Sequence, residues 1–209
     1  IYEILNSGFM YVQGRDYAFR PVIVLQLEVF IKNKLKYSFD EWNQSILCLL
    51  EFIKHNLLIP GQIEHWVVVA NFANCSLFTL PSELKSFITQ MQDNYRSRLA
   101  ASYIVGLSSI MGYIFKLVLA LLEESTQKKF KIVDNLELRK YINSSQIEKQ
   151  FNGETKVKEK CFPPEFDFEF TEDDDCGCLP KDVLKMVILN KNKNIKLLST
   201  HSHSNSSNV

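Results

Sequence analysis

The chain has 209 residues, and its 24 basic residues (Lys and Arg) balance 24 acidic ones, so the formal net charge is zero. Apolar residues make up 46% of the composition, which is enough for a hydrophobic core and excludes wholesale disorder. The charge balance argues against a nucleic-acid-binding protein, whose surface is normally clearly basic. Five cysteines, an odd number, do not indicate a disulfide framework, so we expect a reducing, cytoplasmic location.

Apolar runs separated by turn signals predict five strands, at residues 9–12, 21–30, 65–72, 102–107 and 130–133. Three helices are predicted between them, at 38–57, 82–95 and 109–124. Ser38 and Glu41 form a capping box at the start of the first helix, and Ser82 is expected to cap the second. Because strands alternate with helices, we expect an α/β fold with a mostly parallel five-stranded sheet.

The composition changes after residue 153. Seven acidic residues and no basic ones occupy 165–175, basic residues follow from 181 to 196, and the last ten residues are mostly Ser, His and Asn. We interpret 1–153 as one domain and 154–209 as an acidic, then basic appendage with a poorly ordered end.

The predicted helix at 109–124 is apolar around most of its circumference. Residues 103–122 contain a single charge, Lys116, so a membrane span is an alternative. Gly106 and Gly112 interrupt the stretch and its first third favours a strand, so we prefer a strand followed by an apolar helix. Such a helix is either fully buried or faces an apolar environment that is not protein.

The motifs of common enzymes are missing. The seven glycines form neither a dinucleotide fingerprint nor a phosphate-binding loop, and no nucleophile elbow is present. Two histidines, His55 and His65, have the positions of surface or turn residues. A zinc site is an alternative whose candidate ligands have irregular spacing: Cys161, Cys176, Cys178, His201 and His203. We therefore predict no enzyme, no cofactor and no metal.

Several short stretches match the motifs of one family in the same order. Residues 14–22 read GRDYAFRPV against G-x-D-x-x-G-R-P-V, and residues 71–76 read NFANCS against D-L-x-G-x-S. Residues 94–99 read NYRSRL against N-Y-P-E-R-L, residues 126–130 read TQKKF against T-x-x-K-I, and residues 147–153 read IEKQFNG against L-P-x-E-Y-G-G. Together they resemble the CRAL-TRIO lipid-binding family over about residues 8–153. Phe19, Asn74 and Asn152 replace motif glycines, and Asn tolerates a positive φ best after Gly.

The resemblance implies a pocket for one lipid or other hydrophobic molecule, floored by the sheet and covered by a mobile apolar gate helix, here 110–122. It also implies that Lys129 meets the lipid head group, although Ser97 replaces the glutamate that pairs with this lysine in phosphatidylinositol binders. Trp66 and Val68 replace small polar residues of the choline-binding strand. The candidate ligand-binding residues are Val68, Tyr95, Ser97, Arg98, Met111, Phe115, Val118, Leu122 and Lys129. The family's N-terminal helical extension is expected to be absent.

The leading hypothesis is a lipid carrier that transfers or presents its ligand between membranes through reversible, peripheral contact. The alternative is an interaction module without exchangeable lipid, whose acidic segment 165–175 docks a basic protein partner. An enzyme ranks third, because only Arg98, Glu123 and Lys129 offer titratable groups near the expected pocket.

Overall fold

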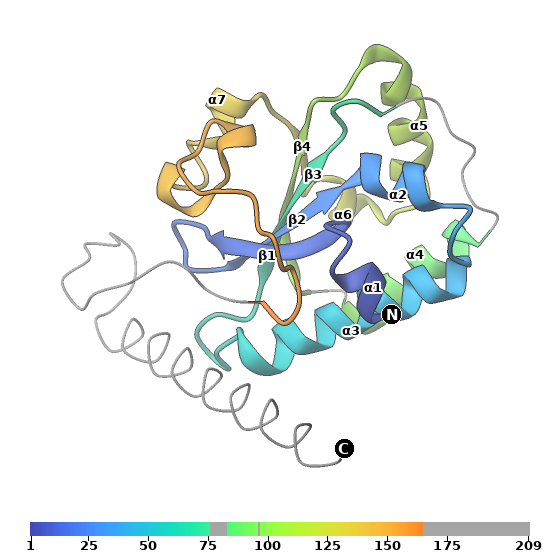
Figure 1. Cartoon of the computed structure of the whole chain (residues 1–209), viewed down its shortest axis with the longest axis horizontal. Helices are drawn as coiled ribbons and strands as arrows, with labels where there is room; N and C mark the ends of the chain where they lie inside the picture. Colours follow the sequence, from blue (N-terminus) through green and yellow to red (C-terminus); the bar gives the residue numbers. More distant parts are fainter. Residues whose placement is uncertain (76–82, 96, 165–209) are drawn as a thin grey trace.

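The computed structural model describes residues 1–75, 83–95 and 97–164, and contains a five-stranded sheet flanked by helices (Figure 1). The strands are β1 (Met10–Arg15), β2 (Pro21–Gln26), β3 (Trp66–Asn71), β4 (Leu99–Val105) and β5 (Phe130–Ile132), and they lie side by side in chain order. β1 pairs with β2 antiparallel, whereas the other three pairings are parallel. The predicted α/β class is therefore confirmed, with a sheet that is mixed rather than purely parallel.

Helices connect the parallel strands. The larger ones are α2 (Leu27–Asn33), α3 (Phe39–Asn56), α4 (Leu84–Tyr95) and α5 (Ser109–Leu119), and the short ones are α1 (Tyr2–Leu5), α6 (Glu124–Gln127), α7 (Asn135–Leu138), η1 (Ser144–Gln146) and η2 (Lys149–Phe151). The predicted capping box is confirmed, because the Ser38 side chain accepts from the Glu41 amide while the Glu41 carboxylate accepts from the Ser38 amide. Ser82 lies outside the described residues.

The predicted bounds differ most from the structure at the end of one strand and at the end of one helix. The strand predicted at 21–30 ends at Gln26, and its apolar continuation forms α2. A short apolar run fits a buried strand and a helix equally well by periodicity, so the pattern could not locate this change. The helix predicted at 109–124 ends at Leu119, where a tight turn follows and α6 begins anew at Glu124.

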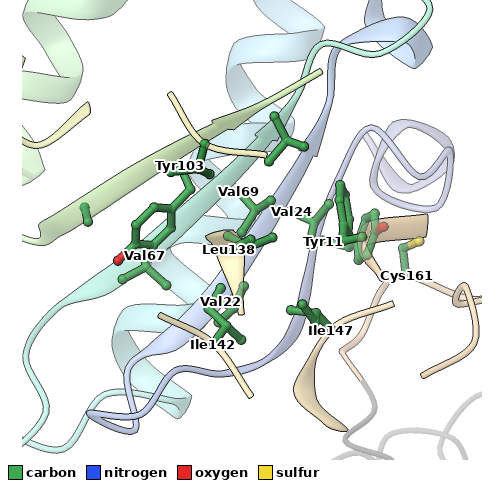
Figure 2. Packing of buried hydrophobic residues seen from close by; sticks show 14 residues of the cluster. Tyr11, Val22, Val24, Val67, Val69, Tyr103, Leu138, Ile142, Ile147 and Cys161 are labelled. Carbon is green, nitrogen blue, oxygen red and sulfur yellow. The ribbon is translucent and has the colours of Figure 1, made fainter. Parts of the chain in front are cut away.

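Successive side chains of each strand point to opposite faces of the sheet, which separates two groups of core residues. α3, α4 and α5 lie over one face, which we call the front face, while α7 and the segment after it lie over the other, the back face (Figure 1). Figure 2 shows the back-face core, where Val22, Val24, Val67 and Val69 of the strands meet Leu138, Ile142 and Ile147.

The residues that replace motif glycines adopt the glycine-like conformation. The φ angles of Phe19, Asn74 and Asn152 are 59°, 58° and 59°. At the first of these turns the buried Asp16 carboxylate accepts hydrogen bonds from the amides of Ala18 and Arg20, at 3.0 and 2.8 Å. The turns survive without glycine because asparagine tolerates this conformation and, at Phe19, because side-chain hydrogen bonds fix the loop.

Candidate ligand site

The front face of the sheet is not completely covered. Residues of one core cluster lie beneath α3 and α4, and residues of another lie beneath α5. Val68, in the central strand β3, packs against both clusters and stays partly exposed. Val68 therefore keeps some apolar surface accessible where the two clusters meet, one beneath α3 and α4 and the other beneath α5.

The helix α5 has two different apolar faces. Met111 and Phe115 are buried, and the Phe115 ring lies 5.8 Å from Phe72 and 6.0 Å from Phe130. The opposite face leaves Ile110, Tyr113 and Leu117 exposed by 56%, 73% and 62%. The predicted all-round apolar helix thus has one side on the sheet and the other in water. The candidate residues Val118 and Leu122 are partly exposed.

A tight loop connects β4 to α5. Gly106 has a φ of +70°, and a Cβ atom at this position would lie 2.8 Å from the Ala73 amide nitrogen. Ser108 then caps α5, because its hydroxyl accepts a hydrogen bond from the Met111 amide at 3.3 Å. Only glycine permits both the left-handed backbone and this close approach, so Gly106 fixes where α5 begins.

Two candidate basic residues lie at the amino end of β4. The Lys129 ammonium, partly buried, donates to the Leu99 carbonyl at 2.7 Å. Arg98 donates to the Glu64 carbonyl at 3.0 Å and lies 3.8 Å from the Glu64 carboxylate. The exposed Ser97 occupies the adjacent turn. The contact with Leu99 uses one of the three N–H donors of the ammonium group.

Tyr95 joins α4 to α3 and to the sheet. Its hydroxyl donates to the Glu51 carboxylate at 2.7 Å, and its ring lies 5.7 Å from the Trp66 ring. Burial and the neighbouring Glu51 raise the pKa of the Tyr95 phenol. The structure therefore places this candidate in the helix packing at the edge of the front face, away from α5.

The sequence prediction missed three apolar side chains of the front face, Leu25, Phe72 and Phe130. All three pack on the core cluster beneath α5. Strand alternation is the signal that could have found them, because Leu25 and Phe130 point to the same face as Val68 through the neighbouring strands. Phe72 follows β3 directly, where alternation no longer decides which way a side chain points.

The structure describes only one of the five residues of the alternative zinc site. Cys161 is buried, and burial raises the pKa of its thiol; the other four candidates lie outside the described residues. Within the described ranges no group of three or more His, Cys, Asp or Glu side chains could hold a metal ion. In the same part of the chain, no helix combines the length and apolarity needed to cross a bilayer.

The family model of the CRAL/TRIO domain matches residues 5–153. The chain therefore belongs to the CRAL/TRIO family, whose members bind lipids or other hydrophobic small molecules. Among solved structures it is similar to the crystal structure of Sfh5, a Sec14-like protein of yeast, with a TM-score of 0.57 and 22% identity. The match covers 68% of this chain and 52% of Sfh5, so the chain spans about half the length of that structure. No curated protein sequence matches significantly.

Proposed function

We propose that this chain holds one lipid or other hydrophobic molecule on the front face, between α5 and the α3–α4 pair, and transfers or presents it between membranes. Family membership supports a hydrophobic ligand. The partly exposed Val68 at the centre of the sheet supports this position, because an apolar ligand there would complete the cover of the front face. The acidic segment of the alternative hypothesis, 165–175, lies outside the described residues.

The two faces of α5 are the observation that carries the proposal. Phe115 anchors the helix on the sheet, while Ile110, Tyr113 and Leu117 form an outer apolar stripe. An exposed stripe of this kind is typical of a surface that meets a partner or a membrane. In the proposed cycle the inner face covers the ligand, and the outer stripe enters the bilayer surface when the ligand is exchanged.

The free energies fit exchange rather than permanent storage. Apolar surface removed from water contributes about 25 cal/mol per Å², on the ligand as well as on the protein. A bilayer offers the ligand an equally apolar environment, so moving it between the two is close to neutral in free energy. The opening of α5 then controls how fast the ligand moves.

Lys129 is the residue that we propose for the head group. Its ammonium group is positioned by the Leu99 carbonyl and retains two further donors for a phosphate oxygen. Ser97 supplies no carboxylate beside it, and Arg98 is directed to Glu64. We therefore propose that the head group is recognised through its phosphate, without the paired carboxylate that the motif N-Y-P-E-R-L provides for inositol.

Native mass spectrometry of the purified chain, with solvent extraction of what it carries, tests ligand binding. We expect one phospholipid or other apolar molecule per chain. A chain that is empty, and that takes up no lipid from vesicles of phosphatidylcholine and phosphatidylinositol, would contradict the proposal and favour the interaction module.

Two matched variants separate binding from transfer. Val68→Phe adds a ring to the uncovered surface, so we expect it to reduce the bound ligand. Leu117→Asp adds a charge to the outer stripe of α5, so we expect normal ligand content but transfer between vesicles slowed at least tenfold. Equal transfer by Leu117→Asp and the parent chain would contradict the membrane role of this stripe.

A further inference from the structure

A chain of hydrogen bonds crosses the back face at the carboxyl ends of β2 and β3. The Asn71 side chain donates to Gln26 Oε1 at 2.9 Å, and Gln26 Nε2 donates to the Tyr11 hydroxyl at 3.3 Å. The Tyr11 hydroxyl donates to the Glu148 carboxylate, at 2.8 and 2.9 Å from its two oxygens. Figure 2 shows Tyr11 pointing from its strand towards the segment that follows Ile147. We call these four residues the back-face relay.

All bonds of the relay run in one direction. Glu148 is 0% exposed, and its carboxyl oxygens accept the hydrogen bond that the Tyr11 hydroxyl donates, so it is the terminal acceptor of the relay. Gln150 also donates to this carboxylate. Because every donor points towards Glu148, each bond polarises the next and the relay holds one arrangement. The relay depends on the residue pattern of this chain, since Glu148 occupies the position of proline in the motif L-P-x-E-Y-G-G.

The other end of the relay reaches the loop that supports α5. Asn71 Oδ1 accepts a hydrogen bond from the Ala73 amide at 3.0 Å. Ala73 lies against Gly106, where an added Cβ would come within 2.8 Å of the Ala73 nitrogen. The neighbouring Phe72 donates from its amide to the Val105 carbonyl at 2.8 Å and contacts the Phe115 ring of α5. The loop thus joins the relay both to the start of α5 and to its buried anchor.

We infer that Tyr11, Gln26, Asn71 and Glu148 are positioning residues for the gate helix: they hold the loop at Ala73 against Gly106 and so keep α5 closed. None of them needs to touch the ligand, because the relay lies on the opposite face of the sheet. The claim that the relay controls ligand release rests on the proposed function. The claim that the relay holds α5 in place does not depend on it.

The variant Tyr11→Phe tests the relay, because it removes the central hydroxyl and keeps the ring in the core. Gln13→Met is the matched control: Gln13 lies on the same strand and donates to Thr155 at 2.7 Å, so its loss weakens the same segment outside the relay. Hydrogen–deuterium exchange of the full chain is measured for the amides of 107–119. We expect roughly fivefold faster exchange in Tyr11→Phe and no change in Gln13→Met.

Exchange in 107–119 that is unchanged in Tyr11→Phe, or raised equally by Gln13→Met, would overturn the inference. Should Tyr11→Phe fail to fold, Gln26→Met breaks the relay at a partly buried position and is judged by the same criteria. A second readout is the release of bound phospholipid into phosphatidylcholine vesicles, which we expect to be faster in Tyr11→Phe with an unchanged amount bound. If the parent chain carries no lipid, the proposed function fails, while the exchange measurement still decides the role of the relay.

Discussion

Phe19 shows how burial outweighs backbone strain at a single residue. A left-handed conformation costs a residue with a side chain about 1–2 kcal/mol. Burying a phenylalanine side chain contributes about 1.5–3 kcal/mol, and Phe19 is only 2% exposed. The buried ring therefore offsets the strain that a glycine would avoid, which explains why the turn persists without the glycine of the motif.

Even a methyl group at Gly106 should destabilise the protein, for two reasons that act together. Gly106→Ala combines the left-handed backbone with a Cβ placed 2.8 Å from the Ala73 nitrogen, so we expect a loss of about 3 kcal/mol in the free energy of unfolding. Gly8→Ala is the control, because its φ is +79° but nothing lies within 4 Å of the added atom; its expected loss is about 1 kcal/mol. Urea unfolding of both variants measures the difference, and equal losses would show that the contact with Ala73 is unimportant.

Lys129 and Lys128 are adjacent lysines with different surroundings. Lys129 is partly buried against Leu99, whereas Lys128 is exposed and paired with Glu124 at 2.7 Å. If Lys129 binds the head-group phosphate, Lys129→Met should weaken uptake of a phospholipid about tenfold, the effect of one charged hydrogen bond. Lys128→Met should leave uptake unchanged. Quantitative lipid binding to both variants checks this, and similar affinities would remove Lys129 from the site.

At the scale of elements, the sequence located the starts of α3 and α5 but missed the start of α2 and the end of α5. The capping box at Ser38 and the serine before α5 both follow from side chains that bind nearby amides, so a few neighbouring residues decide them. The change from β2 to α2 and the end of α5 at Leu119 depend on where the chain leaves the sheet. Tertiary packing determines these two boundaries, and the pattern of apolar residues does not reveal them.

The two caps predict different consequences for the same type of substitution. Ser38 caps α3, a long core helix, so Ser38→Ala should lower the global free energy of unfolding by about 1 kcal/mol. Ser108 caps α5, which is half exposed, so Ser108→Ala should mainly loosen the first turn of that helix. We expect roughly fivefold faster hydrogen exchange at residues 109–112. A global loss in Ser108→Ala as large as that in Ser38→Ala would mean that α5 unfolds only together with the core.

The sequence predicted which residues belong to the candidate site better than it predicted how they are placed. The apolar character of α5 and the match of Lys129 to T-x-x-K-I are visible in the sequence. The side of α5 that faces water, and the bond from Lys129 to the Leu99 carbonyl, depend on how β5 pairs with β4. That register brings together residues thirty positions apart, which no local pattern reports.

At the scale of the whole molecule, the two faces of the sheet are covered to different extents. The back face is sealed by α7 and the segment that follows it, and its buried side chains include Tyr11 and Tyr103. On the front face, Val68 stays partly exposed although helices lie over the sheet, and one of these helices, α5, is itself half exposed. A movement of α5 would therefore leave the back-face core buried, because no α5 residue belongs to that cluster.

The buried tyrosines make the whole fold sensitive to alkali. Burial raises the pKa of Tyr103 to about 12 from its usual 10, and also raises the pKa of Tyr11 and Tyr95. The unfolded chain loses these phenol protons more readily than the folded chain, so the stabilising difference is complete below pH 10 and is lost as the pH rises towards 12. Each such group contributes a slope of up to about 1.4 kcal/mol per pH unit.

Unfolding titrations between pH 8 and 12 measure this dependence. Tyr103→Phe should flatten the fall in the free energy of unfolding between pH 10 and 12 relative to the parent chain. Tyr113→Phe removes an exposed phenol on α5 and should leave the slope as it is. The same slope in all three proteins would contradict a contribution from Tyr103.

The stripe of Ile110, Tyr113 and Leu117 has a further consequence for the protein in concentrated solution. A formal net charge of zero supplies no repulsion to keep copies of the chain apart. Two copies that meet stripe to stripe would hide the same atoms that a bilayer hides in the proposed cycle, so self-association would compete with the proposed membrane docking. Dilution would then free the stripe, and under the proposed function transfer per molecule should rise as the protein concentration falls.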